Sequence, residues 1–179
     1  MFKHVPNILT IIRFFIIPFI VFFALQDNYI TAAFFLILSG ITDIADGFIA
    51  RKYNFITDFG KLMDPLADKC TQVATLVVLV VQHIVPLWIL VVVIIKEFIL
   101  IAGASFLYGK DLVVSSKWYG KISTILFYIA IFFSMIFKQF QLPYTFDTYI
   151  YYLAVVFTIF SLFMYFKAFY VKDFLRKTK

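Results

Sequence analysis

The amino-acid sequence predicts an all-α integral membrane protein, a bundle of six transmembrane helices. Of its 179 residues, 64% are hydrophobic and only 15% are charged, a composition that excludes a soluble globular surface. Short polar segments divide the chain into six apolar stretches of about 20 residues, the length that crosses a hydrocarbon core. Because these spans use almost the whole chain, we expect one membrane domain over residues 1–179.

Polar and turn-forming residues set the expected limits of the spans. A tight polar turn follows the first span at 26–28, a turn with proline follows the third at 83–86, and a polar loop follows the fourth at 109–117. The longest outer loop, at 138–147, precedes the last span. The six expected spans cover residues 7–25, 30–51, 60–82, 87–108, 118–137 and 148–169.

Polar residues recur at three-residue intervals in the first span, at Asn7, Thr10 and Arg13. This spacing keeps them along one side of a helix. Two interpretations of Arg13 remain open: a cation whose alkyl stem lets it reach the membrane surface, or a group that binds an anionic substrate. Pro18 is expected to kink this span.

Four aspartates, where the second span ends and the third begins, form the most informative pattern in the chain. Asp43 and Asp46 share one helix face, and Asp64 and Asp68 share a face of the next helix. A break at 55–58 separates the two helices, with Thr57 or Asp58 as a possible N-cap. The helices therefore present four carboxylates to each other at one membrane face, where acidic side chains are costly and call for a functional role.

These carboxylates predict a site for divalent cations and phosphate. Four uncompensated carboxylates would repel one another, and carboxylate oxygen is the ligand that Mg²⁺ and Mn²⁺ prefer. Small residues on the same faces, Gly47, Ala50 and Gly60, leave room for close packing or a bulky ligand. Arg51 adds a planar donor suited to phosphate.

The same residues resemble the signature of the CDP-alcohol phosphotransferases. The matching pattern is Asp43-x2-Asp46-Gly47-x2-Ala50-Arg51-x8-Gly60-x3-Asp64-x3-Asp68, with all eight defining positions filled. The resemblance implies a CDP-linked donor and cations, Mg²⁺ or Mn²⁺ and two in number, held by Asp43, Asp46 and Asp64. It also implies that Asp68 is the general base and a further metal ligand. Lining of the donor pocket is implied for Asp46, Gly47, Ala50, Arg51 and Gly60.

The stretch VPNILTIIRFFIIPF, at residues 5–19, is similar to the opening of bacterial phosphatidylglycerophosphate synthases and of eukaryotic-type cardiolipin synthases. The resemblance extends over most of the chain and is strongest through Lys69. It implies transfer of a phosphatidyl group from CDP-diacylglycerol to glycerol 3-phosphate, with release of CMP, in a homodimer. Two alternatives remain: a cardiolipin synthase that uses phosphatidylglycerol or another enzyme of the family, and, remotely, a divalent-cation transporter.

Basic residues are the candidates for binding the acceptor phosphate. Lys117 and Lys121 lie one helical turn apart at the start of the fifth span, and Lys61 flanks the aspartates. Lys96 lies near the middle of the fourth span beside Glu97, and adjacent residues point in different directions on a helix. We therefore expect Lys96 and Glu97 to find partners on other helices or in a water-filled cavity. For each lysine, a structural or solvated role is the alternative.

The distribution of basic residues predicts the orientation in the cell membrane. If the N-terminus is inside, the outer loops carry only Lys138. The cytoplasmic ends carry ten basic residues, which are Lys3, Arg51, Lys52, Lys110, Lys117, Lys121, Lys172, Arg176, Lys177 and Lys179. The positive-inside rule then places both termini and the aspartate motif in the cytoplasm. A net charge of +6 is attributed to this topology and to lipid attraction, not to nucleic acid.

Overall fold

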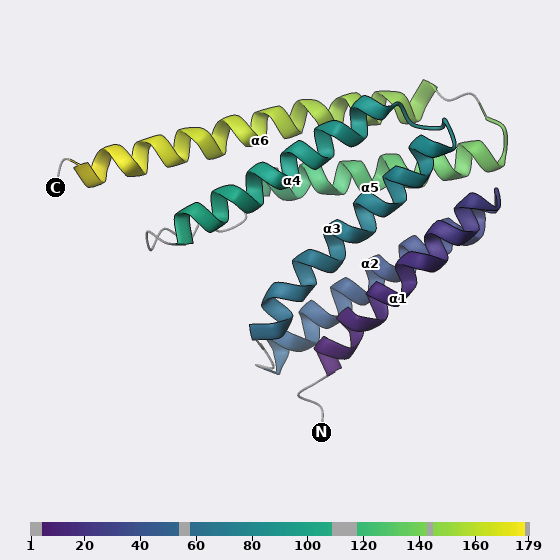
Figure 1. Ribbon diagram of the computed structural model, residues 1–179, viewed down its shortest axis with the longest axis horizontal. Coiled ribbons are helices and arrows are strands. Elements are labelled where there is room, and N and C mark those ends of the chain that lie inside the picture. The colour runs from purple at the N-terminus through teal and green to yellow at the C-terminus, as the bar shows by residue number, and fades with distance from the viewer. Residues whose placement is uncertain (1–4, 54–57, 109–117, 143–144, 178–179) are drawn as a thin grey trace. The chain divides into compact units, whose positions relative to one another are not determined.

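The computed structural model describes residues 5–53, 58–108, 118–142 and 145–177, and the described chain is helical apart from short turns (Figure 1). The helices are α1 (Val5–Leu25), α2 (Tyr29–Lys52), α3 (Asp58–Val81), α4 (Leu87–Tyr108), α5 (Trp118–Gln139) and α6 (Thr145–Lys177). The prediction of six helices is confirmed, and five agree with the expected limits within about two residues. The last helix is longer than the expected span at 148–169. It runs from Thr145 to Lys177 and so includes the basic residues near the C-terminus. Asp58 begins α3, whereas Thr57 lies outside the described residues.

The chain divides into two compact units, which we describe separately. Unit 1 comprises residues 1–90 and 131–144, and unit 2 comprises residues 91–130 and 145–179. Unit 1 therefore holds α1, α2 and α3, whereas unit 2 holds most of α4, the first half of α5, and α6.

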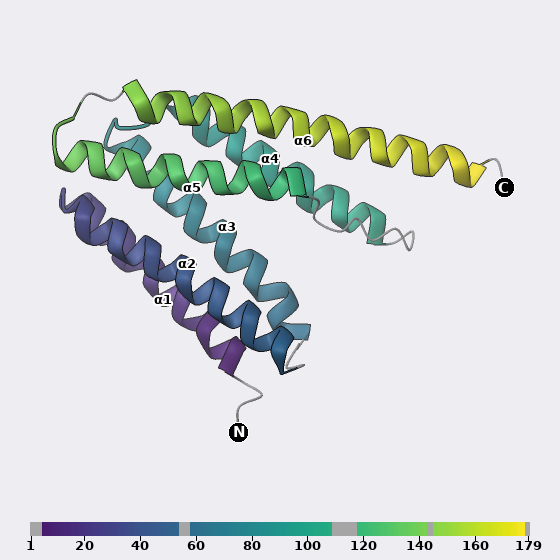
Figure 2. The same ribbon diagram turned by 180° about the vertical axis from the view of Figure 1, so that it is seen from behind.

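In unit 1, α1 packs against both α2 and α3 (Figures 1 and 2). Helices α1 and α3 run in the same direction, because Thr10 contacts Asp64 near their starts and the Gln82 amide donates to the Ala24 carbonyl near their ends. Helix α2 runs the opposite way, and its Phe35 stacks on two rings of α1. The beginning of α1 consequently lies beside the end of α2 and the beginning of α3.

Three turns in unit 1 share one backbone geometry, in which a residue other than glycine adopts a left-handed conformation. These residues are Asp27, His83 and Gln141, with φ of 58°, 57° and 51°. In each turn the next amide donates to the carbonyl five residues earlier, at 3.0, 2.9 and 2.9 Å respectively. This pattern satisfies carbonyl groups left open at the ends of α1, α3 and α5.

Unit 2 is joined by contacts between side chains of its three helices. Lys96 of α4 reaches Thr124 of α5, and Ser123 of α5 shares a hydrogen bond with Thr158 of α6. The ring of Phe127, which is fully buried, lies 6.5 Å from that of Tyr151 on α6. Small and polar side chains at these contacts suit helices that associate within lipid.

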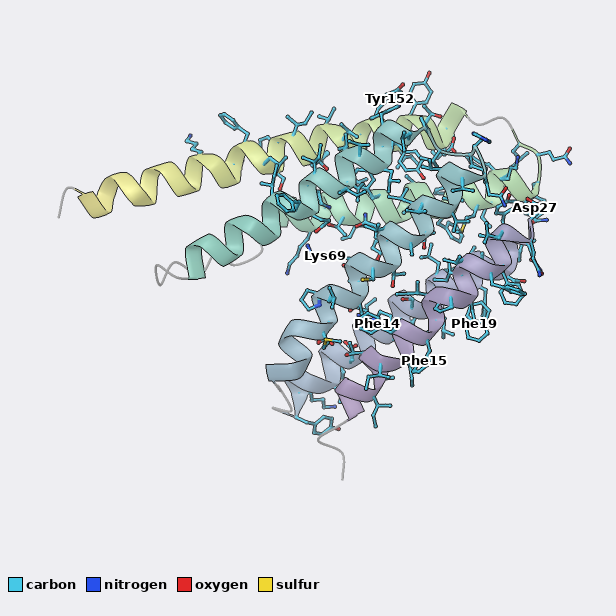
Figure 3. The ribbon with its side chains drawn as sticks, in the orientation of Figure 1. Phe14, Phe15, Phe19, Asp27, Lys69 and Tyr152 are labelled. Carbon is cyan, nitrogen blue, oxygen red and sulfur yellow. The ribbon has the colours of Figure 1, made fainter. Side chains whose placement is uncertain are left out.

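Four helices are long and apolar enough to cross a membrane, judged over the described residues: α1, α2, α5 and α6. Helix α3 carries the charged motif in its first half, and α4 carries Lys96 and Glu97. Large apolar side chains are exposed along the helices, among them Phe15 and Phe19 of α1 and Tyr152 of α6 (Figure 3). Such a surface belongs in lipid, so the chain is a multi-pass membrane protein.

Candidate active site

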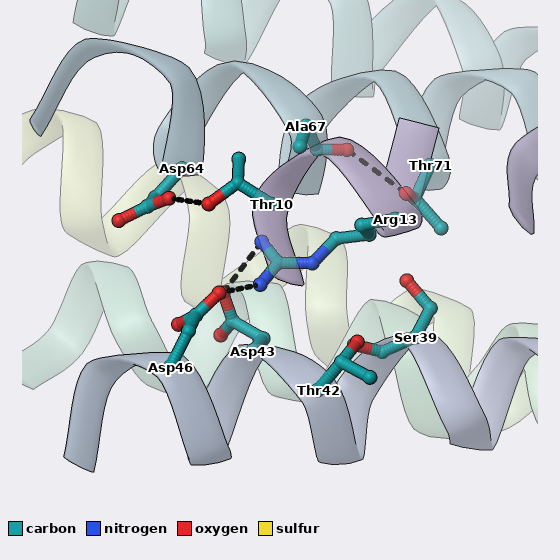
Figure 4. A network of polar contacts seen from close by, with 9 residues as sticks. All are labelled: Thr10, Arg13, Ser39, Thr42, Asp43, Asp46, Asp64, Ala67 and Thr71. Atoms are coloured by element: carbon teal, nitrogen blue, oxygen red, sulfur yellow. Dashed lines mark hydrogen bonds and ion pairs between the residues drawn. The ribbon is translucent and has the colours of Figure 1, made fainter. Parts of the chain in front are cut away.

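Helix α1 contributes two polar side chains to the cluster of aspartates. Thr10 and Arg13 are three residues apart, so they project from one face of the helix toward α2 and α3 (Figure 4). The Thr10 hydroxyl donates a hydrogen bond to Asp64. Arg13 Nη2 donates to Asp46 Oδ2 at 2.5 Å, and Arg13 Nη1 lies 2.7 Å from Asp43 Oδ1. One helix face thus contacts three of the four predicted aspartates.

Burial differs sharply between the two aspartates of α2. Asp46 is 2% exposed and lies with Arg13, itself 1% exposed, inside the protein. The Asp43 side chain is 47% exposed, although it pairs with the same guanidinium. The cluster therefore has a buried side, at Asp46, and a side open to solvent or ligand, at Asp43.

Helix α3 supplies the other two aspartates. Asp64 and Asp68 are both half-buried and lie one turn apart. Near them the Thr71 hydroxyl is satisfied within its own helix, where it donates to the Ala67 carbonyl at 2.8 Å. Gly60, one turn before Asp64, is buried. The predicted face Gly60, Asp64, Asp68 is thus present as a continuous helical stripe.

Arg13 and Thr10 lie between the carboxylates of α2 and that of α3 (Figure 4). Among the described residues, no three histidine, cysteine, aspartate or glutamate side chains form a group able to hold a metal ion. The aspartates nevertheless suit a hard cation in kind, because two carboxylates share one guanidinium, a third is contacted by a neutral hydroxyl, and carboxylate oxygen is the preferred ligand of Mg²⁺ and Mn²⁺. The ligand set Asp43, Asp46, Asp64 and Asp68 stays a prediction.

The structure decides part of what the sequence left open. Arg13 is buried and paired, so its guanidinium does not reach out to a membrane surface. The contact between Thr10 and Asp64 was missed, although the three-residue spacing of polar side chains in an apolar helix was its signal. Four predicted site residues have side chains outside the described residues: Ala50, Arg51, Lys61 and Lys117.

A second buried polar cluster lies in unit 2. Lys96 Nζ is 2.9 Å from Glu97 Oε1 and donates to Thr124 Oγ1 at 3.1 Å, and it lies 5.5 Å from the centre of the Phe127 ring. The prediction that Lys96 and Glu97 do not pair with each other was wrong. Both side chains are long enough to curl toward each other, and burial leaves Lys96 without water to solvate its charge.

Lys121 lies on α5, one turn before Thr124, and is exposed. Buried Lys96 therefore contacts a threonine that lies three residues after exposed Lys121 on α5. Thr124 itself also donates to the Gly120 carbonyl at 3.2 Å. Of the basic residues predicted to bind an acceptor phosphate, these two fall into one neighbourhood of unit 2.

Comparisons with known proteins agree with the motif. Residues 3–160 match the family model described as CDP-alcohol phosphatidyltransferase. The chain is 33% identical over 136 residues to the CDP-diacylglycerol–glycerol-3-phosphate 3-phosphatidyltransferase of Bacillus subtilis, covering 68% of this chain and 70% of that protein. The Mycoplasma genitalium protein of the same name is 30% identical over 194 residues, covering 91% and 82%.

A fungal protein matches part of the chain. The fusion protein of cardiolipin synthase (CMP-forming) and mitochondrial hydrolase from Schizosaccharomyces pombe is 35% identical over 107 residues, covering 60% of this chain and 18% of that protein. The family match spans most of the sequence, including all four motif aspartates and the α1 residues that contact them. The chain belongs to the CDP-alcohol phosphatidyltransferase family.

Proposed function

We propose that the protein transfers a phosphatidyl group from CDP-diacylglycerol to glycerol 3-phosphate, forming phosphatidylglycerophosphate and releasing CMP. The observation that carries this proposal is the gathering of Asp43, Asp46 and Asp64 around Arg13 and Thr10, in a chain whose bacterial relatives bear that enzyme's name. The reaction needs a negatively charged cluster that accepts cations at the membrane, and this cluster has that character.

The cofactors in this proposal are divalent cations, Mg²⁺ or Mn²⁺ and two in number, as the family generally uses divalent metals. Asp43, Asp46 and Asp64 would hold them, with Asp68 as a possible further ligand. Bound cations would neutralise the charge of the donor's pyrophosphate and stabilise CMP as it leaves. The side-chain chemistry supports this assignment, since Arg13 pairs with two of the three carboxylates and the third, Asp64, is contacted by the uncharged Thr10 hydroxyl.

Within this scheme the chain's own residues bind the donor and move a proton. Asp68 takes the proton from the attacking hydroxyl of the acceptor, as a general base one turn from Asp64. Asp46, Gly47, Ala50, Arg51 and Gly60 line the pocket for the CDP group. Arg51 offers a planar fork to the phosphates, and the two glycines leave space for the nucleotide.

The acceptor phosphate would be bound by Lys117, Lys121, Lys61 and Lys96. Support comes from unit 2, where exposed Lys121 lies three residues before Thr124, the residue that buried Lys96 contacts. Glu97 already offsets the charge of Lys96, so Lys121 is the stronger ligand of the two.

The proposed setting is the cell membrane. Six spans form one membrane domain over residues 1–179, with both termini and the active site facing the cytoplasm, where the basic residues gather. We further propose that the chain forms a homodimer among membrane lipids.

A second candidate function changes only the acceptor. The match to a fungal cardiolipin synthase favours phosphatidylglycerol as the alternative acceptor, with cardiolipin as the product. The chemistry at the aspartates would be the same in both reactions.

The test is CMP release by the purified full-length protein in detergent, with CDP-diacylglycerol, Mg²⁺ or Mn²⁺, and each acceptor offered separately. We expect release with glycerol 3-phosphate alone. Release only with phosphatidylglycerol would assign cardiolipin synthesis. No release with either acceptor, in protein that binds the cation, would contradict both assignments and leave another alcohol as the acceptor.

A further inference from the structure

Arg13 contacts the carboxylates to which the proposed function assigns the cations. Its Nη2 lies 2.5 Å from Asp46 Oδ2 and its Nη1 lies 2.7 Å from Asp43 Oδ1. The pair between Arg13 and Asp46 is buried on both sides, so water does not screen it, whereas the pair with Asp43 is partly exposed on the carboxylate side. A divalent cation that used these oxygen atoms would meet a positive charge already beside them.

The guanidinium is incompletely satisfied where it lies. Within the described part of the chain, Nε and Nη1 of Arg13 have no hydrogen-bond acceptor, although Nη1 is within ion-pair distance of Asp43. A buried arginine with only a structural role normally uses most of its five donors. Arg13 is therefore held mainly by charge, through the two carboxylates.

Thr10 provides an internal contrast on the same helix face. Its hydroxyl donates to Asp64 without adding a charge. A hydroxyl fixes the direction of a carboxylate, whereas a guanidinium both fixes it and offsets its charge. The two α1 residues thus act differently on the aspartates of α2 and of α3.

We propose that Arg13 is a positioning residue that serves as an internal counter-charge: it orients Asp43 and Asp46 and competes with the divalent cation for them. This inference rests on the proposed function, in which those aspartates bind the cation. The competition weakens cation binding at Asp43 and Asp46 and keeps it reversible. It also explains how α2 can place the buried carboxylate of Asp46 beside that of Asp43.

Binding of Mn²⁺ alone tests the proposal without any need for turnover. Free Mn²⁺ is measured by its electron paramagnetic resonance signal, with the full-length protein in detergent. We expect Arg13→Gln to bind Mn²⁺ roughly tenfold more tightly or better, because a neighbouring arginine shifts a carboxylate's affinity for a proton by about that factor or more. Arg13→Lys should give a smaller gain, because a compact ammonium pairs with one carboxylate less completely than the planar fork does with two.

A purely structural role for Arg13 predicts the opposite sign, since disordered carboxylates bind a cation less tightly. The matched control is Gln82→Leu, which removes another contact between α1 and α3, at the Ala24 carbonyl, without changing any charge. Its Mn²⁺ affinity should equal that of the wild-type protein. If Gln82→Leu tightens binding as much as Arg13→Gln does, loosened packing is the cause and the proposal is overturned.

The remaining outcomes separate this inference from the proposed function. If Asp46→Asn removes none of the Mn²⁺ binding of the wild-type protein, or if the wild-type protein binds no Mn²⁺, the cation site and the inference both fail. If it does bind Mn²⁺ there, and Arg13→Gln leaves the affinity unchanged or lowers it, only the inference fails. If Arg13→Gln does not fold, Arg13→Lys decides alone: affinity equal to or weaker than wild type overturns the proposal.

Discussion

The two buried polar clusters of this protein differ in their balance of charge. In unit 1, one arginine faces Asp43 and Asp46, and the nearby Asp64 is contacted by the uncharged Thr10. In unit 2, the Lys96 ammonium pairs with the carboxylate of Glu97, donates a hydrogen bond to Thr124 and lies over the face of the Phe127 ring. The first cluster has an excess of negative charge, whereas the second is neutral as a pair.

This difference shows how a polar cluster in a membrane protein can be assigned a role. A neutral, hydrogen-bonded pair can persist within the bundle without any ligand, so it can serve to hold helices together. Carboxylates in excess are costly at membrane depth and favour a bound cation. The excess in unit 1 therefore indicates chemistry, whereas in unit 2 Glu97 already offsets the charge of Lys96, so exposed Lys121 is the stronger candidate there for binding an acceptor phosphate.

The strongest test of the unit 1 cluster is Asp68→Asn. If Asp68 is the general base, this change should lower the turnover number by about 10²–10⁴-fold, the usual contribution of a positioned base. If Asp68 is the base alone, binding of Mn²⁺ and of CDP-diacylglycerol should change little, whereas weaker Mn²⁺ binding would identify it as a further metal ligand. The measurement is CMP release alongside equilibrium binding of both ligands. Wild-type turnover in this variant would remove Asp68 from the role.

The corresponding test of unit 2 is Glu97→Gln, which leaves buried Lys96 without its carboxylate. We expect the free energy of unfolding to fall by about 3–5 kcal/mol, as for other buried ion pairs that lose one partner. Asp43→Asn should lower the free energy of unfolding by less, because Arg13 retains its ion pair with Asp46. Unfolding in detergent measures both.

A control for this comparison removes both charges of the unit 2 pair. The double variant Lys96→Met with Glu97→Leu should recover most of the stability lost in Glu97→Gln, since apolar residues of similar volume often replace a buried ion pair without loss. Failure of the double variant to recover stability would mean that the pair does more than hold the helices together.

Lys121→Ala tests whether Lys121 of unit 2 binds the acceptor phosphate or only faces solvent. If Lys121 binds the acceptor phosphate, the apparent KM for glycerol 3-phosphate should rise roughly tenfold, as expected when a charged hydrogen bond is lost. The KM for CDP-diacylglycerol should stay the same. Lys138→Ala, at the opposite end of α5, is the matched control and should change neither value. An unchanged acceptor KM in Lys121→Ala would assign this residue to the solvated surface.

The smallest expected effect concerns the hydrogen bond between Ser123 and Thr158, which joins α5 to α6 at 2.8 Å. A double-mutant cycle of Ser123→Ala and Thr158→Val should give a coupling of about 0.6 kcal/mol and not above about 1.7 kcal/mol, the range found for such bonds in membranes. The readout is the free energy of unfolding in detergent. A much larger coupling would indicate that the two hydroxyls belong to a wider network.

Much of the fold followed from the sequence because helix limits are a local property. Apolar stretches and polar breaks located all six helices, and the motif spacing located the stripes of aspartates on α2 and α3. The partner of each side chain depends instead on how neighbouring helices are aligned. The sequence therefore marked Arg13 as unusual without identifying Asp43 and Asp46 as its partners.

The error at Lys96 and Glu97 has the same origin. Helical periodicity separates the Cβ atoms of adjacent residues, but it does not describe how far long side chains bend when no water is near. The ion pair at 2.9 Å joins the ends of both side chains, and the helix faces on which the two residues lie do not determine where those ends are. Thr124 and Phe127, which complete the surroundings of Lys96, lie on another helix.

The three turns that end α1, α3 and α5 offer a route to a more robust protein for biochemical work. A left-handed backbone costs an ordinary residue about 1–2 kcal/mol, and glycine avoids this cost at some expense in unfolded-state entropy. Asp27 accepts a hydrogen bond from the Tyr29 hydroxyl and is best kept, but His83 and Gln141 are exposed. Glycine at these two positions should raise thermal stability in detergent while leaving the aspartate cluster untouched.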